Sequence, residues 1–399
     1  MKRIRKILVL LIIGLIGCNS NIQNSHTKNI KKIDIRKAFS NPKRISLGKI
    51  AKEIKYIYLE SSDECQIANI AKVSFDGIYK RIYIYDNLLT QILIFNQKGK
   101  YINKIKNLGE APFEYKNIKS ICFDYKANII YILDSKQFKI LKYDTDGNFI
   151  SYFKTPKNIN LFKIFINNGN IIAYIEKPFI IENNYYSFIE FDKMGNIIKR
   201  FYKWDKSCCS WDDTGPGAIF GHYNNFIQFK ETSSDTVFKI SNDCKITPLY
   251  QIVVNDSPIE KEIITKGNRM NWLKDHNEIY SFIETNNLFF FYGIHKLTRA
   301  DICFFKDSNS GYVVLFDYDI CDTGFYDDIS GGMPFFPTGK INDSTLFQII
   351  EPIKLQQVIS SDFYDTVKIR NSVQHSKLME FALKSNLETN PIIAIVKLK

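Results

Sequence analysis

The chain has 399 residues, with 54 Lys and Arg against 42 Asp and Glu and a formal net charge of +12. Its lysines lie mostly singly, without a run of five or more, which gives no support to a nucleic-acid-binding protein. The five histidines form no H-E-x-x-H or H-x-H pair and no G-x-S-x-G sequence occurs, so these zinc-enzyme and serine-hydrolase motifs are excluded.

The first 17 residues have the pattern of a bacterial lipoprotein signal. Four basic residues precede an apolar stretch, residues 7–16, that is too short to span a bilayer. The following Leu-Ile-Gly-Cys resembles a lipobox, which implies cleavage before Cys18 and a diacylglycerol on its sulfur. An ordinary secretory signal followed by a chance Cys is the alternative. Loss of the four basic residues would lower the net charge from +12 to +8.

We therefore expect three parts. Residues 1–17 are the signal peptide, residues 18–29 a lipidated flexible tether, and residues 30–399 the folded domain. Acyl chains on Cys18 would anchor the protein to a membrane, most simply the outer membrane of the cell envelope. Whether the domain faces the periplasm or the outside stays open.

A repeat with a period of 48 residues follows. Segments 86–104 and 134–152, and the stretch that ends at residue 199, share two apolar runs around a polar turn with one Gly. The matching positions are Phe95, Tyr143 and Phe191, and then Gly99, Gly147 and Gly195. Glycine suits such a turn because it adopts positive φ without steric cost. A strand-rich unit of this length is typical of one blade of a β-propeller.

The repeat becomes weaker toward the C-terminus. Residues 235–245 fit a fourth copy and residues 278–319 a fifth, and the last segment supplies strands at 346–350 and 392–396. The sequence therefore predicts an all-β, six-bladed β-propeller, with seven blades as the alternative. Strand-like runs at 33–35 and 54–58 could complete the final blade and close the ring. Helical periodicity is limited to residues 376–384.

The chain beyond the signal resembles a family of six-bladed β-propeller lipoproteins of Gram-negative bacteria, broadly akin to NHL-type propellers. The resemblance rests on six short stretches in order: residues 54–61, 94–100, 109–115, 235–238, 327–337 and 390–393. It implies the fold and no single reaction. Ala111 and Phe113 depart from the family's G-x-G-P-G-E-Y loop, in which both positions are Gly, so a loop that needs positive φ there would change shape.

The loop 204–217 is the first candidate binding site. It carries two of the three Trp residues beside acidic residues, and aromatic faces next to carboxylates commonly hold sugars. The candidate ligand-binding residues are Trp204, Asp205, Trp211, Asp212 and Asp213. The alternative is an insertion between blades whose Trp side chains cover the core.

Two further candidates are weaker. Asp322, Asp327 and Asp328 could supply oxygen ligands to Ca²⁺, although they form no complete calcium-loop pattern and a solvated loop is the alternative. Glu114 and Tyr115 could face the central channel, or they could anchor their own loop. No other cofactor is predicted.

Seven cysteines remain if Cys18 carries lipid, and an odd number argues against a fully paired disulfide framework. No C-x-x-C pair supports a thiolate zinc site. We expect most of them to be small apolar residues in strands, as with Cys303.

The sequence thus favours an exported binding or scaffolding module whose ligand is a glycan or a peptide. One alternative is a polysaccharide hydrolase or lyase, which rests on analogy with other propellers. Another is a partner in a protein complex of the envelope. The basic charge could attract acidic glycans or anionic lipids, although compositional drift toward Ile, Asn and Lys explains it equally simply.

Overall fold

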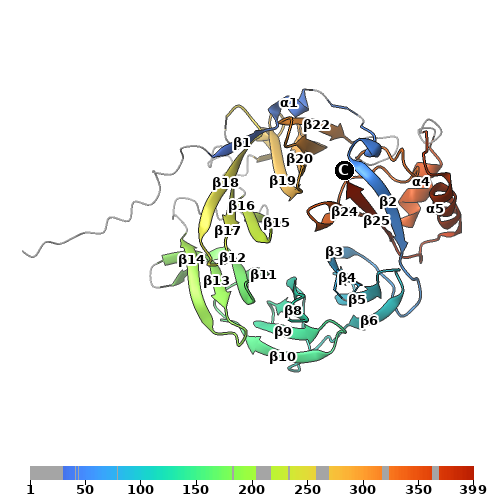
Figure 1. Ribbon diagram of the computed structural model, residues 1–399. Helices are drawn as coiled ribbons and strands as arrows, with labels where there is room; N and C mark the ends of the chain where they lie inside the picture. Colours follow the sequence, from blue (N-terminus) through green and yellow to red (C-terminus); the bar gives the residue numbers. More distant parts are fainter. Residues whose placement is uncertain are drawn as a thin grey trace, which may run out of the picture.

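The computed structural model describes residues 30–399 except 41, 44, 79, 182–183, 204–216, 232–233, 258–268, 317–322 and 362–367. The described strands form six sheets arranged in a ring around a central axis (Figure 1). The six-bladed β-propeller predicted from the repeat is therefore confirmed.

The first three blades are four-stranded antiparallel sheets that follow one another along the chain. Blade 1 contains β3 (Ile70–Asp76), β4 (Arg81–Asp86), β5 (Gln91–Asn96) and β6 (Tyr101–Ile105). Blade 2 contains β7 (Ser120–Asp124), β8 (Ile129–Asp134), β9 (Lys139–Asp144) and β10 (Phe149–Lys154). Blade 3 contains β11 (Leu161–Asn167), β12 (Asn170–Ile181), β13 (Asn184–Phe191) and β14 (Ile197–Lys203).

The later blades keep this order, and the first strand of each lies nearest the axis (Figure 1). Blade 4 contains β15 (Ala218–Tyr223), β16 (Phe226–Glu231), β17 (Thr236–Ile240) and β18 (Ile246–Val253). Blade 5 contains β19 (Asn277–Glu284), β20 (Leu288–His295), β21 (Thr298–Phe305) and β22 (Ser310–Leu315). Blade 6 contains β23 (Gly339–Asn342), β24 (Thr345–Ile350) and β25 (Ile392–Leu398).

The ring is closed by a strand from the N-terminal part of the chain. Strand β2 (Ala51–Tyr58) pairs antiparallel with β25 and becomes the outer strand of blade 6, which confirms the prediction for residues 54–58. The same prediction is wrong for residues 33–35. Strand β1 (Lys31–Asp34) instead runs parallel to β18 as a fifth strand of blade 4, where Ile33 and Ile35 are buried in the core shared with blade 5.

Helices are few and short. Those in the described part of the chain are α1 (Arg36–Phe39), the 3₁₀ helix η1 (Leu47–Lys49), α3 (Arg269–Trp272), α4 (Pro352–Ile359) and α5 (Ser372–Lys384). The predicted helix 376–384 lies within α5, which begins four residues earlier because the Asn371 side chain accepts a hydrogen bond from the Gln374 N–H. Within the described part of the chain, no helix is long and apolar enough to cross a membrane.

The repeated turns have the geometry that their sequence predicts. Gly99, Gly147 and Gly195 have φ values of +83°, +93° and +92°. In the second turn, Asp144 Oδ1 accepts hydrogen bonds from the N–H groups of Asp146 and Asn148, so this Asp-rich stretch is a hairpin turn. Each turn also packs closely on its neighbours, since a Cβ on Gly195 would lie 2.4 Å from the Phe153 ring.

The described cysteines Cys65, Cys122, Cys244 and Cys303 are all buried and unpaired, as expected. Cys122 and Cys303 lie in strands as expected, whereas Cys65 and Cys244 do not. Cys244 lies in a turn with φ +61°, where the first three repeats have Gly. The remaining cysteines of the domain, Cys208, Cys209 and Cys321, lie outside the described residues.

Candidate functional site

A cavity of about 1640 Å³ lies on the axis of the ring. It is lined by the first strand of every blade, namely β3, β7, β11, β15, β19 and β23, and by turns that follow these strands. Each of these strands is the edge of its sheet, so its axial N–H and C=O groups have no partner strand. The cavity wall therefore combines backbone polar groups with the side chains of six strands.

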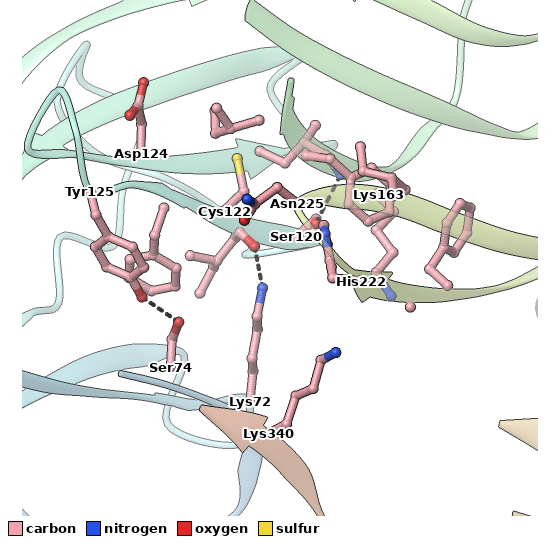
Figure 2. A pocket seen from close by; sticks show the side chains of 18 of the residues that line it. Lys72, Ser74, Ser120, Cys122, Asp124, Tyr125, Lys163, His222, Asn225 and Lys340 are labelled. Atoms are coloured by element: carbon pink, nitrogen blue, oxygen red, sulfur yellow. Dashed lines mark hydrogen bonds between the residues drawn. The ribbon is translucent and has the colours of Figure 1, made fainter. Parts of the chain in front are cut away.

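Side chains of adjacent blades occupy part of these strand edges. Lys72 Nζ on β3 donates a hydrogen bond of 2.6 Å to the Ile121 carbonyl on β7, as Figure 2 shows. Ser120 Oγ accepts one of 3.1 Å from the Ile164 N–H on β11. These contacts connect the first three blades around the axis and leave less of their edges free for an added strand.

Two lysines in blades 1 and 3 have no acidic partner among the residues that the structure describes. Lys163 Nζ lies 5.8 Å and 5.1 Å from the ring centroids of Phe165 and Phe220, and Lys72 Nζ lies 5.7 Å from that of Phe123. Within the described part of the chain, neither ammonium group is within ion-pair distance of a carboxylate. The contacts with aromatic faces compensate only part of the lost hydration of a cation.

The surroundings of the cavity disfavour positive charge. Loss of hydration inside the cavity lowers the pKa of Lys72, and the same loss together with the charge of Lys72 lowers the pKa of Lys163 to about 8. Burial and then the charges of Lys72, Lys340 and Lys163 lower the pKa of His222 to about 4, so His222 is neutral at pH 7. Lys72 and His222 expose surface to solvent within the cavity that they line, so both can reach a ligand there.

The part of the wall formed by blades 5 and 6 contains ion pairs that neutralise its charges. In blade 6, Lys340 Nζ contacts Asp343 Oδ1 at 2.6 Å. In blade 5, Glu284 pairs with Lys306 at 2.6 Å and accepts a hydrogen bond of 3.0 Å from the Tyr250 hydroxyl. Lys306 and Lys340 therefore have acidic partners, whereas Lys72 and Lys163 have none in the described part of the chain. The cavity has a net positive side formed by blades 1 and 3.

The candidate binding loop lies outside the described residues. This holds for Trp204, Asp205, Trp211, Asp212 and Asp213, and also for Cys18 and Asp322. Their proposed roles stay predictions of the sequence.

Glu114 and Tyr115 serve as anchors of their own loop. The Tyr115 side chain is fully buried, and its hydroxyl donates to the carbonyls of Thr90 and Ile105. Glu114 Oε2 accepts a hydrogen bond of 2.8 Å from the Ala111 N–H. Neither residue lines the axial cavity, which favours loop anchoring over the expectation that they face the channel. Their role in ligand binding stays a prediction. The loop tolerates Ala111 and Phe113 because neither has positive φ.

The carboxylate oxygens of Asp327 and Asp328 accept hydrogen bonds from other groups of the protein. Asp327 accepts hydrogen bonds from the N–H groups of Ile329, Ser330 and Gly332, and from the Tyr56 hydroxyl at 2.9 Å. Asp328 accepts one from the Gly48 N–H at 2.7 Å and pairs with Arg370. Within the described part of the chain, no group of three or more His, Cys, Asp or Glu could hold a metal ion. Calcium at this loop stays a prediction.

Sequence reasoning did not identify Lys72, Lys163 and His222. The available signal is a charged residue within the apolar first strand of a blade, as in Phe162-Lys163-Ile164. The first strands of blades 2 and 3 begin 41 residues apart instead of 48. The later blades also differ in length, so counting along the chain does not align these positions.

Comparison with known proteins identifies a family and a fold. A family model described as a domain of unknown function, DUF4934, matches residues 30–397. Among solved structures, a protein inferred to be exported, from Bacteroides fragilis NCTC 9343, superposes with a TM-score of 0.71 at 18% identity, covering 92% of this chain and all of that one. A DUF4221 family member from Bacteroides vulgatus ATCC 8482 superposes with a TM-score of 0.52 at 10% identity, covering 88% and 97%. Both likenesses concern the fold alone.

Two curated proteins are also similar to this chain in sequence. An uncharacterised protein of Methanocaldococcus jannaschii is 30% identical over 196 residues, which are 47% of this chain and 58% of that protein. The chain thus spans little more than half the length of this relative. A membrane-bound lytic murein transglycosylase A homologue of Buchnera aphidicola subsp. Schizaphis graminum is 22% identical over 301 residues, which are 73% of this chain and 70% of that protein.

Proposed function

The chain belongs to the DUF4934 family of domains of unknown function, and we propose that it is an exported binding module whose ligand enters the axial cavity. The observation that carries this proposal is a cavity of about 1640 Å³ lined by all six blades. Ligand pockets of proteins commonly have volumes of roughly 300–1,000 Å³, so a ligand of several sugar rings or residues would fit.

The composition of the wall supports binding of a polar ligand. Aromatic rings such as Phe123 and Phe220 alternate with amide and hydroxyl groups such as Asn225 and Ser120. Sugar rings use the former for stacking and the latter for hydrogen bonds. Both features belong to first strands and their turns, which the packed blades hold in place.

A thermal-shift screen of glycans and peptides tests the proposal. A ligand at a hundred times its Kd stabilises the folded state by roughly 2.7 kcal/mol, which such a screen detects. The binding site is then located with Phe123→Leu and Phe220→Leu, which remove a ring face and keep apolar volume. We expect both to weaken the ligand that the screen identifies.

The loop 204–217 supplies the competing location. Trp204→Ala and Trp211→Ala remove its aromatic faces. Loss of binding in these two variants, together with unchanged binding in the two Phe variants, would move the site from the cavity to the loop. The reverse result would support the cavity.

Lipid anchoring through Cys18 is part of the same proposal. The supporting observation is the order of basic start, short apolar stretch and Leu-Ile-Gly-Cys at the N-terminus. We expect Cys18→Ala to abolish partitioning into detergent. A processed product that still partitions fully would contradict the anchor, without bearing on the cavity.

Catalysis on a polysaccharide is the second candidate, favoured by the curated relative described as a lytic murein transglycosylase A homologue. In the cavity, the Glu284 carboxylate accepts hydrogen bonds from Tyr250 and Gln228 and pairs with Lys306. Release of reducing ends or shorter fragments from a bound glycan, lost in Glu284→Gln, would establish the enzyme.

A further inference from the structure

We infer that Lys72, Lys163 and His222 form a subsite for an anionic group on a saccharide, such as the carboxylate of a uronic acid. The inference rests on the proposed function, because it names the chemical class of the ligand that the cavity accepts.

The positive charges of Lys72 and Lys163 have no carboxylate partner among the described residues. Lys72 and Lys163 reach the same cavity from β3 and β11, and the described residues offer neither of them a carboxylate. Like charges enclosed by protein repel each other and disfavour the folded state unless a counter-charge is present. Lys340, which also lines the cavity, has such a partner in Asp343. An anion from the ligand would supply the missing partner on the side of blades 1 and 3.

The same three side chains have N–H groups that are available as hydrogen-bond donors. An ammonium group has three N–H donors, and Lys72 uses one of them on the Ile121 carbonyl. Lys163 uses none on an oxygen within the described part of the chain. Neutral His222 adds one ring N–H, and its exposed surface faces the cavity. This set of donors matches the several lone pairs of a carboxylate or a sulfate ester.

The occupied edges of the first strands favour a saccharide over an extended peptide as the ligand. A peptide that added as a strand would need the free edges of the first strands. Lys72 already occupies the Ile121 carbonyl and Ser120 the Ile164 N–H. The partly exposed ring of Phe220 instead lies beside Lys163, where the apolar face of a sugar can stack while its acidic group meets the lysines.

The test compares an acidic saccharide with its neutral counterpart. Binding of short oligogalacturonates and of their carboxyl-reduced forms to the full chain in mild detergent is measured by calorimetry. We expect the acidic form to bind about 10- to 100-fold more tightly, as loss of a hydrogen bond to a charged group predicts. Lys72→Met and Lys163→Met should each remove most of this difference and leave the neutral form bound as before.

Lys199→Met is the matched control. Lys199 Nζ also donates to one carbonyl, that of Asp243 at 2.7 Å, and lies 5.8 Å from a phenylalanine ring, that of Phe201. It lies on β14, away from the cavity. We expect this variant to bind the acidic form like the unaltered protein, so a general loss of surface charge would be recognised.

The outcomes separate the inference from the proposed function. Equal binding of acidic and neutral saccharides, or an acidic preference that survives both lysine substitutions, overturns the subsite and leaves the binding module standing. Absence of binding by any saccharide or peptide overturns both. Inorganic sulfate that displaces the oligogalacturonate and binds as tightly by itself overturns the saccharide part, because a free anion would then be the ligand.

A second measurement needs no natural ligand. Pyridoxal 5′-phosphate is an anionic aldehyde; its carbonyl condenses with an uncharged lysine amine to an imine and water, and added borohydride delivers hydride to the imine carbon to give a stable secondary amine. We expect labelling at Lys163 to exceed that at Lys199, and oligogalacturonate to protect Lys163 selectively. Labelling of Lys199 and other surface lysines ahead of Lys163 would overturn the subsite.

Discussion

At the scale of single residues, the axial lysines have surroundings that disfavour their own charge. Lys163 is half-buried between two phenylalanine rings, and the charge of Lys72 acts on it from a neighbouring strand. A charged lysine at this position therefore makes the folded protein less stable than an apolar side chain of similar length would. Stability is often lost in this way at binding sites, where the ligand provides the compensating interaction.

Lys163→Met tests this conflict between stability and binding. Methionine keeps an unbranched apolar chain and removes the charge, so we expect the melting temperature of the ligand-free protein at pH 7 to rise by roughly 1–3 °C. Differential scanning calorimetry measures the shift. A melting temperature that falls would mean that the ammonium group makes a net stabilising interaction in the absence of ligand.

The pH dependence follows from the lowered pKa of Lys163. Its value of about 8 in the folded protein is below the ordinary 10.5 of the unfolded chain, so the unfolded state holds the proton more tightly. The unfavourable contribution of Lys163 to stability is therefore full below pH 8 and diminishes between about pH 8 and 10.5. Binding of an acidic saccharide should weaken over the same interval, because the ammonium form is lost.

Other groups around Lys163 must be considered in that titration. Lys72 faces it from β3, His222 from β15, Lys119 lies at the Phe162 ring, and the paired Lys340 and Asp343 belong to blade 6. Lys163→Met removes the part that belongs to Lys163 itself. Calorimetric titration from pH 6 to 10 on both proteins checks the prediction, and an affinity that is flat across pH 8 in the unaltered protein contradicts it.

Asn390 is the residue on which the junction of the two chain ends depends. Its side chain accepts a hydrogen bond from the Ile67 N–H at 3.0 Å and donates to the carbonyls of Glu60 and Cys65 at 2.6 and 2.8 Å. It is 2% exposed. Asn390→Ala leaves these backbone groups without partners, so we expect a loss of about 1–3 kcal/mol in the free energy of unfolding.

Urea denaturation measures the effect, with Asn386→Ala as control. Asn386 is an exposed amide that accepts hydrogen bonds only within its own turn. We expect less than about 1 kcal/mol from this control. Equal effects of the two substitutions would show that Asn390 does not stabilise the junction specifically.

At the scale of elements, the closing strand β2 is more important than its neighbour β1. β2 pairs along its whole length with β25 and so joins the two ends of the ring. β1 adds a fifth strand to a blade that is already complete. The propeller should therefore depend on β2 for closure and on β1 only for covering apolar surface.

Two N-terminal deletions separate these roles. Removal of residues 30–35 should lower the melting temperature and keep one cooperative transition. Removal of residues 30–59 should abolish the cooperative transition, because blade 6 loses its outer strand and exposes the edge of β25. Cooperative unfolding of the longer deletion near the temperature of the shorter one would contradict the role given to β2.

The elements that sequence reasoning identified are those determined by local signals. The Gly at the turns, the strands before and after them, and residues 376–384 of α5 are each specified by neighbouring residues. Residues 33–35 carry an equally good strand signal, but their partner β18 lies more than 200 residues away. An alternating apolar pattern predicts that a strand forms, but it does not predict which sheet edge the strand joins.

At the scale of the whole molecule, the sequence repeat predicts the ring of blades but not which side chains line the axial cavity. Repeated strand-rich units close around an axis, so the copies of the repeat predict a propeller even though the later blades differ in length. The charge of the cavity depends on how Lys72, Lys163 and His222 converge from blades 1, 3 and 4. Unequal blade lengths place these residues at irregular intervals in the sequence, so only the three-dimensional arrangement brings them together.

The central claim is that the ligand binds on the axis of the propeller. A crystal structure of the full chain with an oligogalacturonate tests it most directly. We predict electron density for the saccharide within the cavity, with oxygens of one acidic group at about 2.7–3.2 Å from Nζ of Lys72 and of Lys163. An oligosaccharide held by the loop 204–217 or by an outer blade face, with the cavity free of it, would contradict the account.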